Sequence, residues 1–179
     1  MKRNIIIYGL IAGAIVTILM AINVSMCINS GNYDGSILVG YATMLIAFSM
    51  IFVGIKNYRD KYNEGVISFG KAFKIGFFIA LIASTIYVAG WLIEEQLFFP
   101  DFMDKYVAHE LSKLKASGMS DAAIAAKTEE LNQAKEMYKN PMIKILMTYA
   151  EILPVGLVVT LISSLILKRK TAKHNLVIN

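Results

Sequence analysis

The sequence predicts an all-α polytopic membrane protein, with a bundle of four transmembrane helices and an extracytoplasmic αα-hairpin between the third and fourth spans. Its composition is the first observation behind this prediction. Hydrophobic residues make up 56% of the 179 residues and charged residues only 17%, whereas a soluble domain carries about 25% charged residues. The apolar residues are gathered into four long runs, and the charges between the runs are unevenly distributed. We therefore expect one membrane domain over residues 1–179.

Each apolar run is long enough to cross a bilayer. The hydrocarbon core requires about 20 mainly apolar residues in a helix that rises about 1.5 Å per residue. Lipid offers no hydrogen bonds to an open sheet edge, so each run must satisfy its own backbone groups as a helix. Tyr87 and Trp91 fall near the outer end of the third run, where interfacial aromatic belts lie. The predicted spans are residues 5–27, 36–55, 72–93 and 142–167.

The first run has a second interpretation as a cleaved signal peptide, because Lys2 and Arg3 precede it. Secretory signals have an apolar core of about 7–15 residues. Here the apolar stretch continues over residues 5–22, and no clear small-residue cleavage site follows it. We expect a retained transmembrane span.

The charges between the runs predict the orientation. Basic residues in short loops stay on the cytoplasmic side. Segments 1–4, 56–74 and 168–179 hold eleven basic residues and two acidic ones, while segments 28–35 and 94–141 hold six basic and ten acidic ones. Both termini, including the tail 168–179, are therefore expected in the cytoplasm.

The basic residues of the second loop invite two interpretations. One is a specific phospholipid site, and the other is a solvated turn whose cations anchor two span ends among lipid headgroups. Both interpretations account for the net charge of +5 without nucleic acid as a partner. The candidate headgroup residues are Lys56, Arg59, Lys61, Lys71 and Lys74.

Residues 101–139 predict two helices outside the membrane. Apolar residues recur there at helical spacing, and Asp101 and Ser120 stand where N-caps are expected. Gly118 suits the left-handed residue that ends a helix. The short connection between the two helices predicts an antiparallel hairpin.

No metal or cofactor is expected. His109 lies among scattered acids without a ligand spacing such as HExxH. Cys27 is the only cysteine, so it has no partner for a disulfide within the chain. Near the outer end of the first span it is expected to pack as a small apolar group.

Small residues recur every four positions along three of the spans, which predicts close helix packing. Lipid tails are as apolar as Leu, so membrane helices associate through close contact rather than through exclusion of water. The stripes serve either the interior of one bundle or, on the first span, a homodimer. The candidate packing residues are Gly9, Gly13, Gly76, Ala80 and Gly156, with Pro154 as a predicted kink.

Glu151 is a carboxylate inside the fourth apolar run, about 13 Å along the helix from Met142. Lys144 and Thr148 share its helix face. Burial of an acid in lipid costs about 2.5–3.5 kcal/mol at the centre of a span and less at this depth. Glu151 is therefore expected to face a protein group or water. Candidate partners on other spans are Asn23, Ser84, Thr85 and Tyr87.

Four stretches together resemble a known family. They are YRDKYNEGVISFGKAFKIG, YVAGW, KASGMSDAAI and EILPVGLVVTLISSLILKRK. The chain resembles the bacterial membrane proteins of domain-of-unknown-function family 4199 over nearly its whole length. The resemblance implies a four-span protein of the bacterial inner membrane and implies no activity. It also suggests that the Glu151–Pro154 pair and the SFGKAF turn belong to the family pattern.

Two functions are carried forward from the sequence. The first is a non-enzymatic structural or accessory protein, in which Glu151 makes hydrogen bonds across the bundle. Its partners are the lipid bilayer and either a second copy of the chain or another membrane protein. The second is a small transporter or ion-coupled permease, in which Glu151 lines a cleft open to the outside as a proton or cation site. A lipid-modifying enzyme is not expected, because the sequence contains neither HExxH nor GxSxG.

Overall fold

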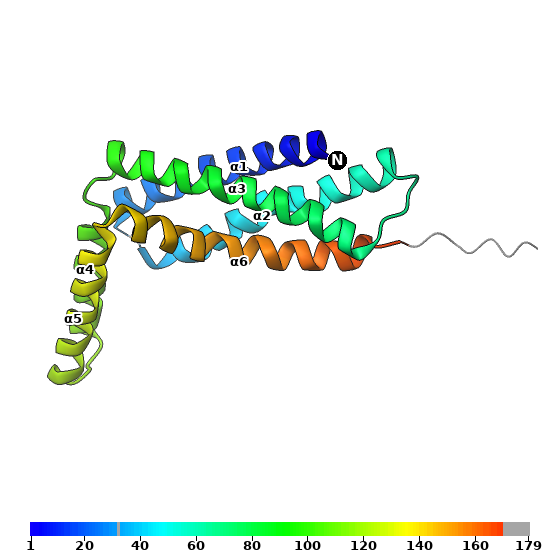
Figure 1. The fold of residues 1–179 in the computed structure, drawn as a ribbon. Helices are drawn as coiled ribbons and strands as arrows, with labels where there is room; N and C mark the ends of the chain where they lie inside the picture. Colours follow the sequence, from blue (N-terminus) through cyan, green and yellow to red (C-terminus); the bar gives the residue numbers. More distant parts are fainter. Residues whose placement is uncertain (32, 170–179) are drawn as a thin grey trace, which may run out of the picture.

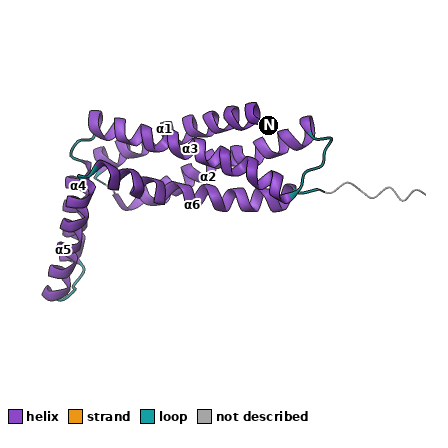
Figure 2. Cartoon of the chain, viewed as in Figure 1, coloured by secondary structure: helices purple, strands orange, loops and turns teal. Residues whose placement is uncertain are grey.

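The computed structural model describes residues 1–31 and 33–169, and this part of the chain is almost entirely helical (Figure 2). Four of its helices are long and apolar enough to cross a membrane. The predicted all-α class with four apolar spans is therefore confirmed. The helices in chain order are α1 (Lys2–Ser30), α2 (Tyr33–Tyr62), α3 (Phe69–Phe98), α4 (Phe102–Ala116), α5 (Asp121–Tyr138) and α6 (Pro141–Leu167).

The four long helices α1, α2, α3 and α6 lie side by side, and α4 and α5 form a hairpin that projects sideways from one end of them (Figure 1). The N-terminus, the α2–α3 connection and the end of α6 lie at the opposite end. We call the end that carries α4 and α5 the hairpin end. The other is the basic end, because it carries Lys2, Arg3 and the basic residues of 56–74.

Capping groups explain where several helices begin. The Ser68 side chain accepts a hydrogen bond from the backbone N–H of Lys71, and α3 starts there. Asn140 accepts from the N–H groups of Met142 and Ile143, with Pro141 as the first helical residue of α6. The helices extend beyond the predicted apolar runs, because helical hydrogen bonding continues into polar residues outside the hydrocarbon.

The hairpin follows the sequence prediction with one difference. Ser120 caps α5 by accepting from the N–H of Ala123, and Gly118 has a left-handed φ of 69°. Asp101 stands at the N-cap of α4, but its side chain makes no capping hydrogen bond. Val107 is the one buried residue of α4, and α5 has none within the described residues. The hairpin therefore contacts the bundle at one end and projects beyond it.

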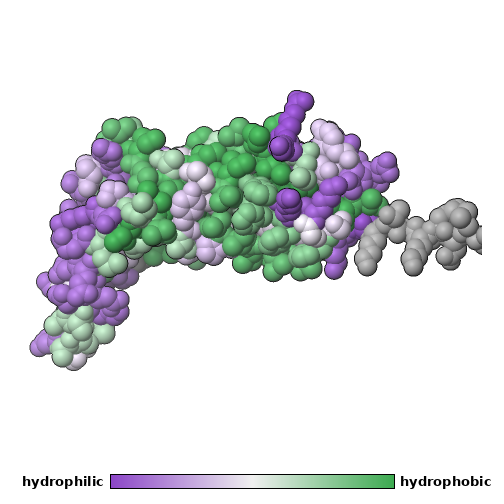
Figure 3. Space-filling model, in the orientation of Figure 1, coloured by the Kyte–Doolittle hydropathy of each residue, from purple (hydrophilic) through white to green (hydrophobic). Residues whose placement is uncertain are grey.

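The face of the bundle seen in Figure 3 is largely apolar between two hydrophilic ends. Large hydrophobic side chains point outward along it, including Leu38 (79% exposed) and Ile166 (65% exposed). A monomeric protein in water rarely exposes a continuous apolar surface of this size. This apolar surface between two hydrophilic ends has the polarity expected of a surface that faces lipid.

Glycine allows the helices to approach closely. A Cβ on Gly76 would lie 2.7 Å from Cγ2 of Thr160, and a Cβ on Gly156 would lie 3.0 Å from Cβ of Ala80. On α1, Gly9 and Gly13 lie directly against Ile82 and Ile86 of α3. The helix continues through Pro154, which lies on an exposed face of α6.

Polar contacts join the helices at the basic end. The N–H of Ile67 donates to the carbonyl of Arg169 over 2.9 Å, and the N–H of Arg169 donates back over 2.8 Å. The buried Asn4 amide donates to the Gly54 carbonyl over 2.8 Å. These bonds connect the α2–α3 loop to the end of α6, and α1 to α2. Residues 170–179 of the expected tail lie outside the described residues.

Candidate functional site

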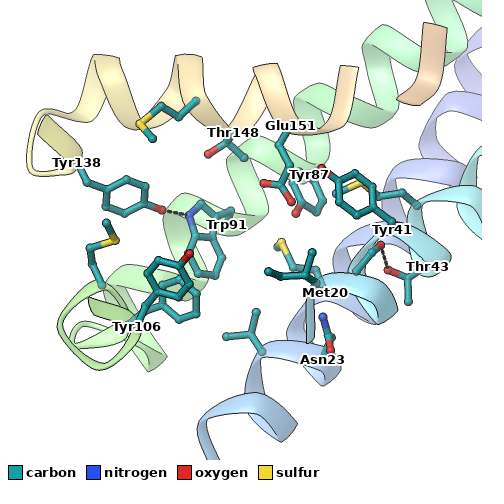
Figure 4. A pocket seen from close by; sticks show the side chains of 17 residues that line it. Met20, Asn23, Tyr41, Thr43, Tyr87, Trp91, Tyr106, Tyr138, Thr148 and Glu151 are labelled. Atoms are coloured by element: carbon teal, nitrogen blue, oxygen red, sulfur yellow. Dashed lines mark hydrogen bonds between the residues drawn. The ribbon is translucent and has the colours of Figure 1, made fainter. Parts of the chain in front are cut away.

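A cavity of about 470 Å³ lies at the hairpin end, where the bundle meets α4 and the last residue of α5 (Figure 4). All six helices contribute to its wall. Four kinds of side chain face it: aromatic rings, methionines, the aliphatic side chains of Val24 and Ile37, and a small polar group. The polar group consists of Asn23, Thr43, Thr148 and Glu151.

Glu151 enters the cavity from α6 and lies beside the ring of Tyr87 from α3 (Figure 4). The next residue, Ile152, is completely buried in the core. The burial of Ile152 in the core fixes the rotation of α6 about its axis, and this rotation directs the neighbouring Glu151 side chain toward the cavity. Glu151 is ten residues beyond Pro141, which corresponds to a depth of about 15 Å along the helix.

The two threonine hydroxyl groups of the wall donate within their own helices. Thr148 Oγ1 donates to the carbonyl of Lys144 over 2.8 Å, and Thr43 Oγ1 donates to the carbonyl of Gly40 over 2.7 Å. Their oxygens retain lone pairs that can accept from a molecule in the cavity. The polar part of the wall is therefore rich in hydrogen-bond acceptors.

The rim ties the hairpin to the bundle. Trp91 Nε1 donates to the Tyr138 hydroxyl over 2.5 Å, and the Trp91 ring packs edge-on against Phe102 of α4. Burial raises the pKa of Tyr138 to about 12. Tyr138 is therefore neutral at physiological pH and brings no charge to the rim.

Lys144 also lies at the rim, and its charge is already matched. Its Nζ contacts both carboxylate oxygens of Glu95 at 2.7 Å. The same nitrogen lies 4.8 Å from the centre of the Tyr138 ring. The side chains of the Lys144–Glu95 pair are only 14% and 15% exposed. The ammonium group is thus held above the cavity by a carboxylate and a ring.

The structure brings four of the six candidate site residues together. Asn23, Tyr87, Thr148 and Glu151 line the cavity, whereas Lys144 pairs with Glu95 outside it. Ser84 is buried in α3 without a hydrogen-bond partner and does not line the cavity.

Several residues around the cavity lie differently from the sequence expectation or were not expected there. Tyr87 and Trp91, expected in an interfacial belt, are each only 6% exposed and turn inward. Thr85, another candidate partner of Glu151, accepts instead from the Tyr149 hydroxyl over 2.9 Å. The contributions of the hairpin and of Met20 and Tyr41 were not predicted. Aromatic side chains on the otherwise polar hairpin were the signal that could have indicated them.

The candidate headgroup residues lie at the basic end, and their role toward lipid stays a prediction. Arg59 pairs with Asp60 and donates to the carbonyl of Leu167. Lys71 donates to Asn63 over 2.7 Å. The three exposed candidates are Lys56, Lys61 and Lys74.

Chemically, the cavity can bind but offers few groups for catalysis. None of the described residues that line it is Lys, Arg, His or Cys, and Glu151 is the one carboxylate among them. Within residues 1–31 and 33–169, no three His, Cys, Asp or Glu side chains gather as metal ligands would. A single carboxylate among aromatic rings and hydroxyl groups is suited to recognition of a small molecule.

The model of a family described as "protein of unknown function (DUF4199)" matches residues 7–169. No curated protein and no solved structure matches the chain. The matched range includes every residue that lines the cavity. The site is therefore contained within the part of the chain that the family defines.

Proposed function

The chain belongs to the DUF4199 family, whose function is unknown, and from the cavity we propose that it is a non-enzymatic membrane protein that binds a small molecule. The single observation that carries this proposal is the cavity with an intramembrane carboxylate on its wall. Its volume of about 470 Å³ lies within the range of about 300–1,000 Å³ that small-molecule sites occupy. An acid within a transmembrane segment usually has a functional role.

The proposal places the protein in the bacterial inner membrane with both termini in the cytoplasm. Support comes from the charges, because the basic end holds the N-terminus, the α2–α3 loop and the end of α6. The cavity and the hairpin then face the extracytoplasmic side. In this orientation the cavity receives its ligand from the outer leaflet or from the periplasm. The protein then acts as an accessory subunit that holds this ligand.

Trp91 provides a direct test, because it is the only tryptophan of the chain and lines the cavity. We expect a screen of small amphiphiles against the full chain in lipid nanodiscs to give saturable changes in Trp91 fluorescence. Gly40→Leu places a side chain on the cavity wall and should abolish the change. Gly70→Leu is the matched control, since no atom lies within 4 Å of a Cβ there. No saturable response in the screen, or a response unaffected by Gly40→Leu, overturns the proposal.

A second function, a small transporter or ion-coupled permease that uses Glu151, is favoured by one specific observation. The hydroxyl groups of Ser84, Thr160 and Ser164 are buried on α3 and α6 without hydrogen-bond partners. They follow Glu151 and Tyr87 toward the basic end, where a path for a proton or a small cation would continue. Flux into liposomes that contain the protein tests this function. Loss of flux in Glu151→Gln supports transport, and absence of flux with the unchanged chain rules it out.

A further inference from the structure

We propose that the cavity selects an organic cation with an apolar body, whose charged group is held by Glu151 and the surrounding aromatic rings. This inference rests on the proposed function, because it names the chemical class of the small molecule that the cavity binds. Three observations carry it: the charge of the wall, the placement of the aromatic rings and the flexible side chains that complete the enclosure.

The charge on the cavity wall has one sign. Glu151 is the one acidic residue of the wall, and no basic residue lines it among the described residues. Lys144, at the rim, is held by both oxygens of Glu95 and by the ring of Tyr138. Glu151 is exposed in the structure, and a carboxylate within a membrane span that has no counter-charge is unfavourable. A positively charged ligand supplies that counter-charge, whereas an anion is repelled.

Aromatic rings surround the space in front of the carboxylate. Tyr41 and Tyr87 lie near Glu151, and Trp91 and Tyr106 lie toward the hairpin (Figure 4). The face of an aromatic ring carries negative charge density and attracts cations within about 6 Å of its centre. The attraction grows as the bound cation and the ring lose contact with water. The rings therefore favour a cation that has little affinity for water.

The same rings argue against an inorganic ion as the ligand. Calcium and magnesium require about six or more oxygen ligands, while the wall offers one carboxylate and a few hydroxyl and amide oxygens. A quaternary or alkylated ammonium group loses less hydration and needs no fixed coordination. Its apolar body also matches a wall that is largely aromatic and aliphatic.

Four methionines complete the cavity wall and determine how widely the shape of a ligand can vary. They are Met20, Met44, Met103 and Met147, and they come from four different helices. Unbranched thioether side chains adapt to irregular shapes and are common on surfaces that bind several ligands. The site is therefore expected to select for charge more strictly than for the shape of the apolar body.

A pair of compounds that differ only in charge tests this inference. Benzyltrimethylammonium carries a quaternary nitrogen, and neopentylbenzene has carbon in its place with the same shape. With the full chain in nanodiscs, we expect saturable quenching or enhancement of Trp91 fluorescence by the cation. The cation should bind at least tenfold more tightly than its neutral isostere.

Two variants, compared with a control at the opposite end of the bundle, assign the selectivity to the cavity. Glu151→Gln keeps the shape of the side chain and removes its charge, so the affinity for the cation should fall at least tenfold while that for the neutral compound stays unchanged. Glu64→Gln removes a carboxylate from the α2–α3 loop at the opposite end and should change neither. Tyr41→Leu removes one exposed ring from the wall and should weaken cation binding selectively.

Equal affinity for the two compounds, or an unchanged affinity in Glu151→Gln, shows that the ligand is not selected as a cation. That result leaves small-molecule binding intact. Absence of any saturable response to the cation also contradicts this inference. The wider amphiphile screen described above then decides separately whether the proposed function fails as well.

Discussion

Where α3 faces α2 and α6, the two ends of the bundle differ in how closely the helices approach one another, whereas α1 lies close to α3 even at the hairpin end, with Gly90 directly against Thr17. Toward the basic end, Gly76 of α3 lies directly against Thr160 of α6 and Ile51 of α2. At the hairpin end the same helices enclose a cavity of about 470 Å³ lined by rings and methionines. Gly156 lies between the two regions, against Phe48 and Ala80.

The difference shows that the size of the side chains at the contacts decides whether membrane helices touch or separate. Glycine lets two backbones approach until the next side chain meets them. Large aromatic residues such as Trp91 and Tyr87 hold the backbones apart, and where they do not fill the intervening space a cavity remains. Among α2, α3 and α6 the close glycine contacts and the candidate site thus occupy different depths.

The loops repeat this contrast. The short α2–α3 loop at the basic end is joined to α6 by the two hydrogen bonds between Ile67 and Arg169. At the other end, α4 and α5 are held to the bundle mainly by ring contacts of Tyr33, Phe102 and Tyr138. The hairpin is therefore the part whose position should respond to a molecule in the cavity.

The largest expected effect on the free energy of unfolding is the difference between replacing Gly76 and replacing Gly40 by alanine. Gly76→Ala should lower the free energy of unfolding by about 1–3 kcal/mol, because its Cβ would lie 2.7 Å from Thr160 Cγ2. Gly40→Ala at the hairpin end should be neutral or stabilise by up to about 1 kcal/mol, since its nearest neighbour, Asn23 Nδ2, is 3.7 Å away. Denaturant titration in detergent micelles measures both. Equal effects of the two changes would remove the contrast between the ends.

A smaller effect is expected from the ion pair at the rim. Lys144→Met and Glu95→Gln should each destabilise the protein, because each leaves one polar partner of a largely buried pair. In a double-mutant cycle the coupling between them should be about 1–2 kcal/mol. A coupling near zero would mean that Lys144 is not committed to Glu95 and is available to Glu151.

Tyr138 should give a pH-dependent effect of about 1–2 kcal/mol, because its deprotonation places a charge in a desolvated site; two pKa units correspond to about 2.7 kcal/mol before screening by water. Burial raises the pKa of Tyr138 from 10.0 to about 12, so the folded state favours the neutral phenol. Its stabilisation is present in full below pH 10 and is lost as the pH rises through about 12. Tyrosinate absorbance and thermal unfolding follow this change, and Tyr138→Phe should remove it. A normal titration of Tyr138 would show that the hairpin is not docked on Trp91.

The smallest effect on stability is expected from an ion pair between the two hairpin helices. Asp104 pairs with Lys135 between α4 and α5, and this pair raises the pKa of Lys135 through its hydrogen bond. Asp104→Asn should leave the melting temperature of the bundle unchanged, because the pair is solvated. Hydrogen exchange in α4 and α5 should become faster. A cooperative loss of the whole bundle would instead show that hairpin and bundle fold as one unit.

Local signals were sufficient for most of the fold. The four apolar runs predicted four spans, and Ser120 and Gly118 marked the turn of the hairpin before the structure showed them as cap and left-handed residue. Asp101 had the right position but makes no capping bond. Such features depend on neighbouring residues, which is why sequence reasoning finds them.

The site was only partly predictable. Helical spacing placed Thr148 and Glu151 on one face, and both line the cavity. The same spacing included Lys144, whose partner Glu95 is 49 residues away in the chain. Trp91 resembled a membrane-interface residue but is buried. In an apolar helix nearly every face is hydrophobic, so the pattern says little about its rotation.

The sequence by itself determined the number, length and type of the helices, because lipid forces each apolar segment to satisfy its backbone hydrogen bonds internally. It also determined that one carboxylate lies among them. Only the tertiary structure decided what that carboxylate faces. A cavity is the space left between side chains of separate helices, and its existence depends on how each helix is rotated and how closely it packs.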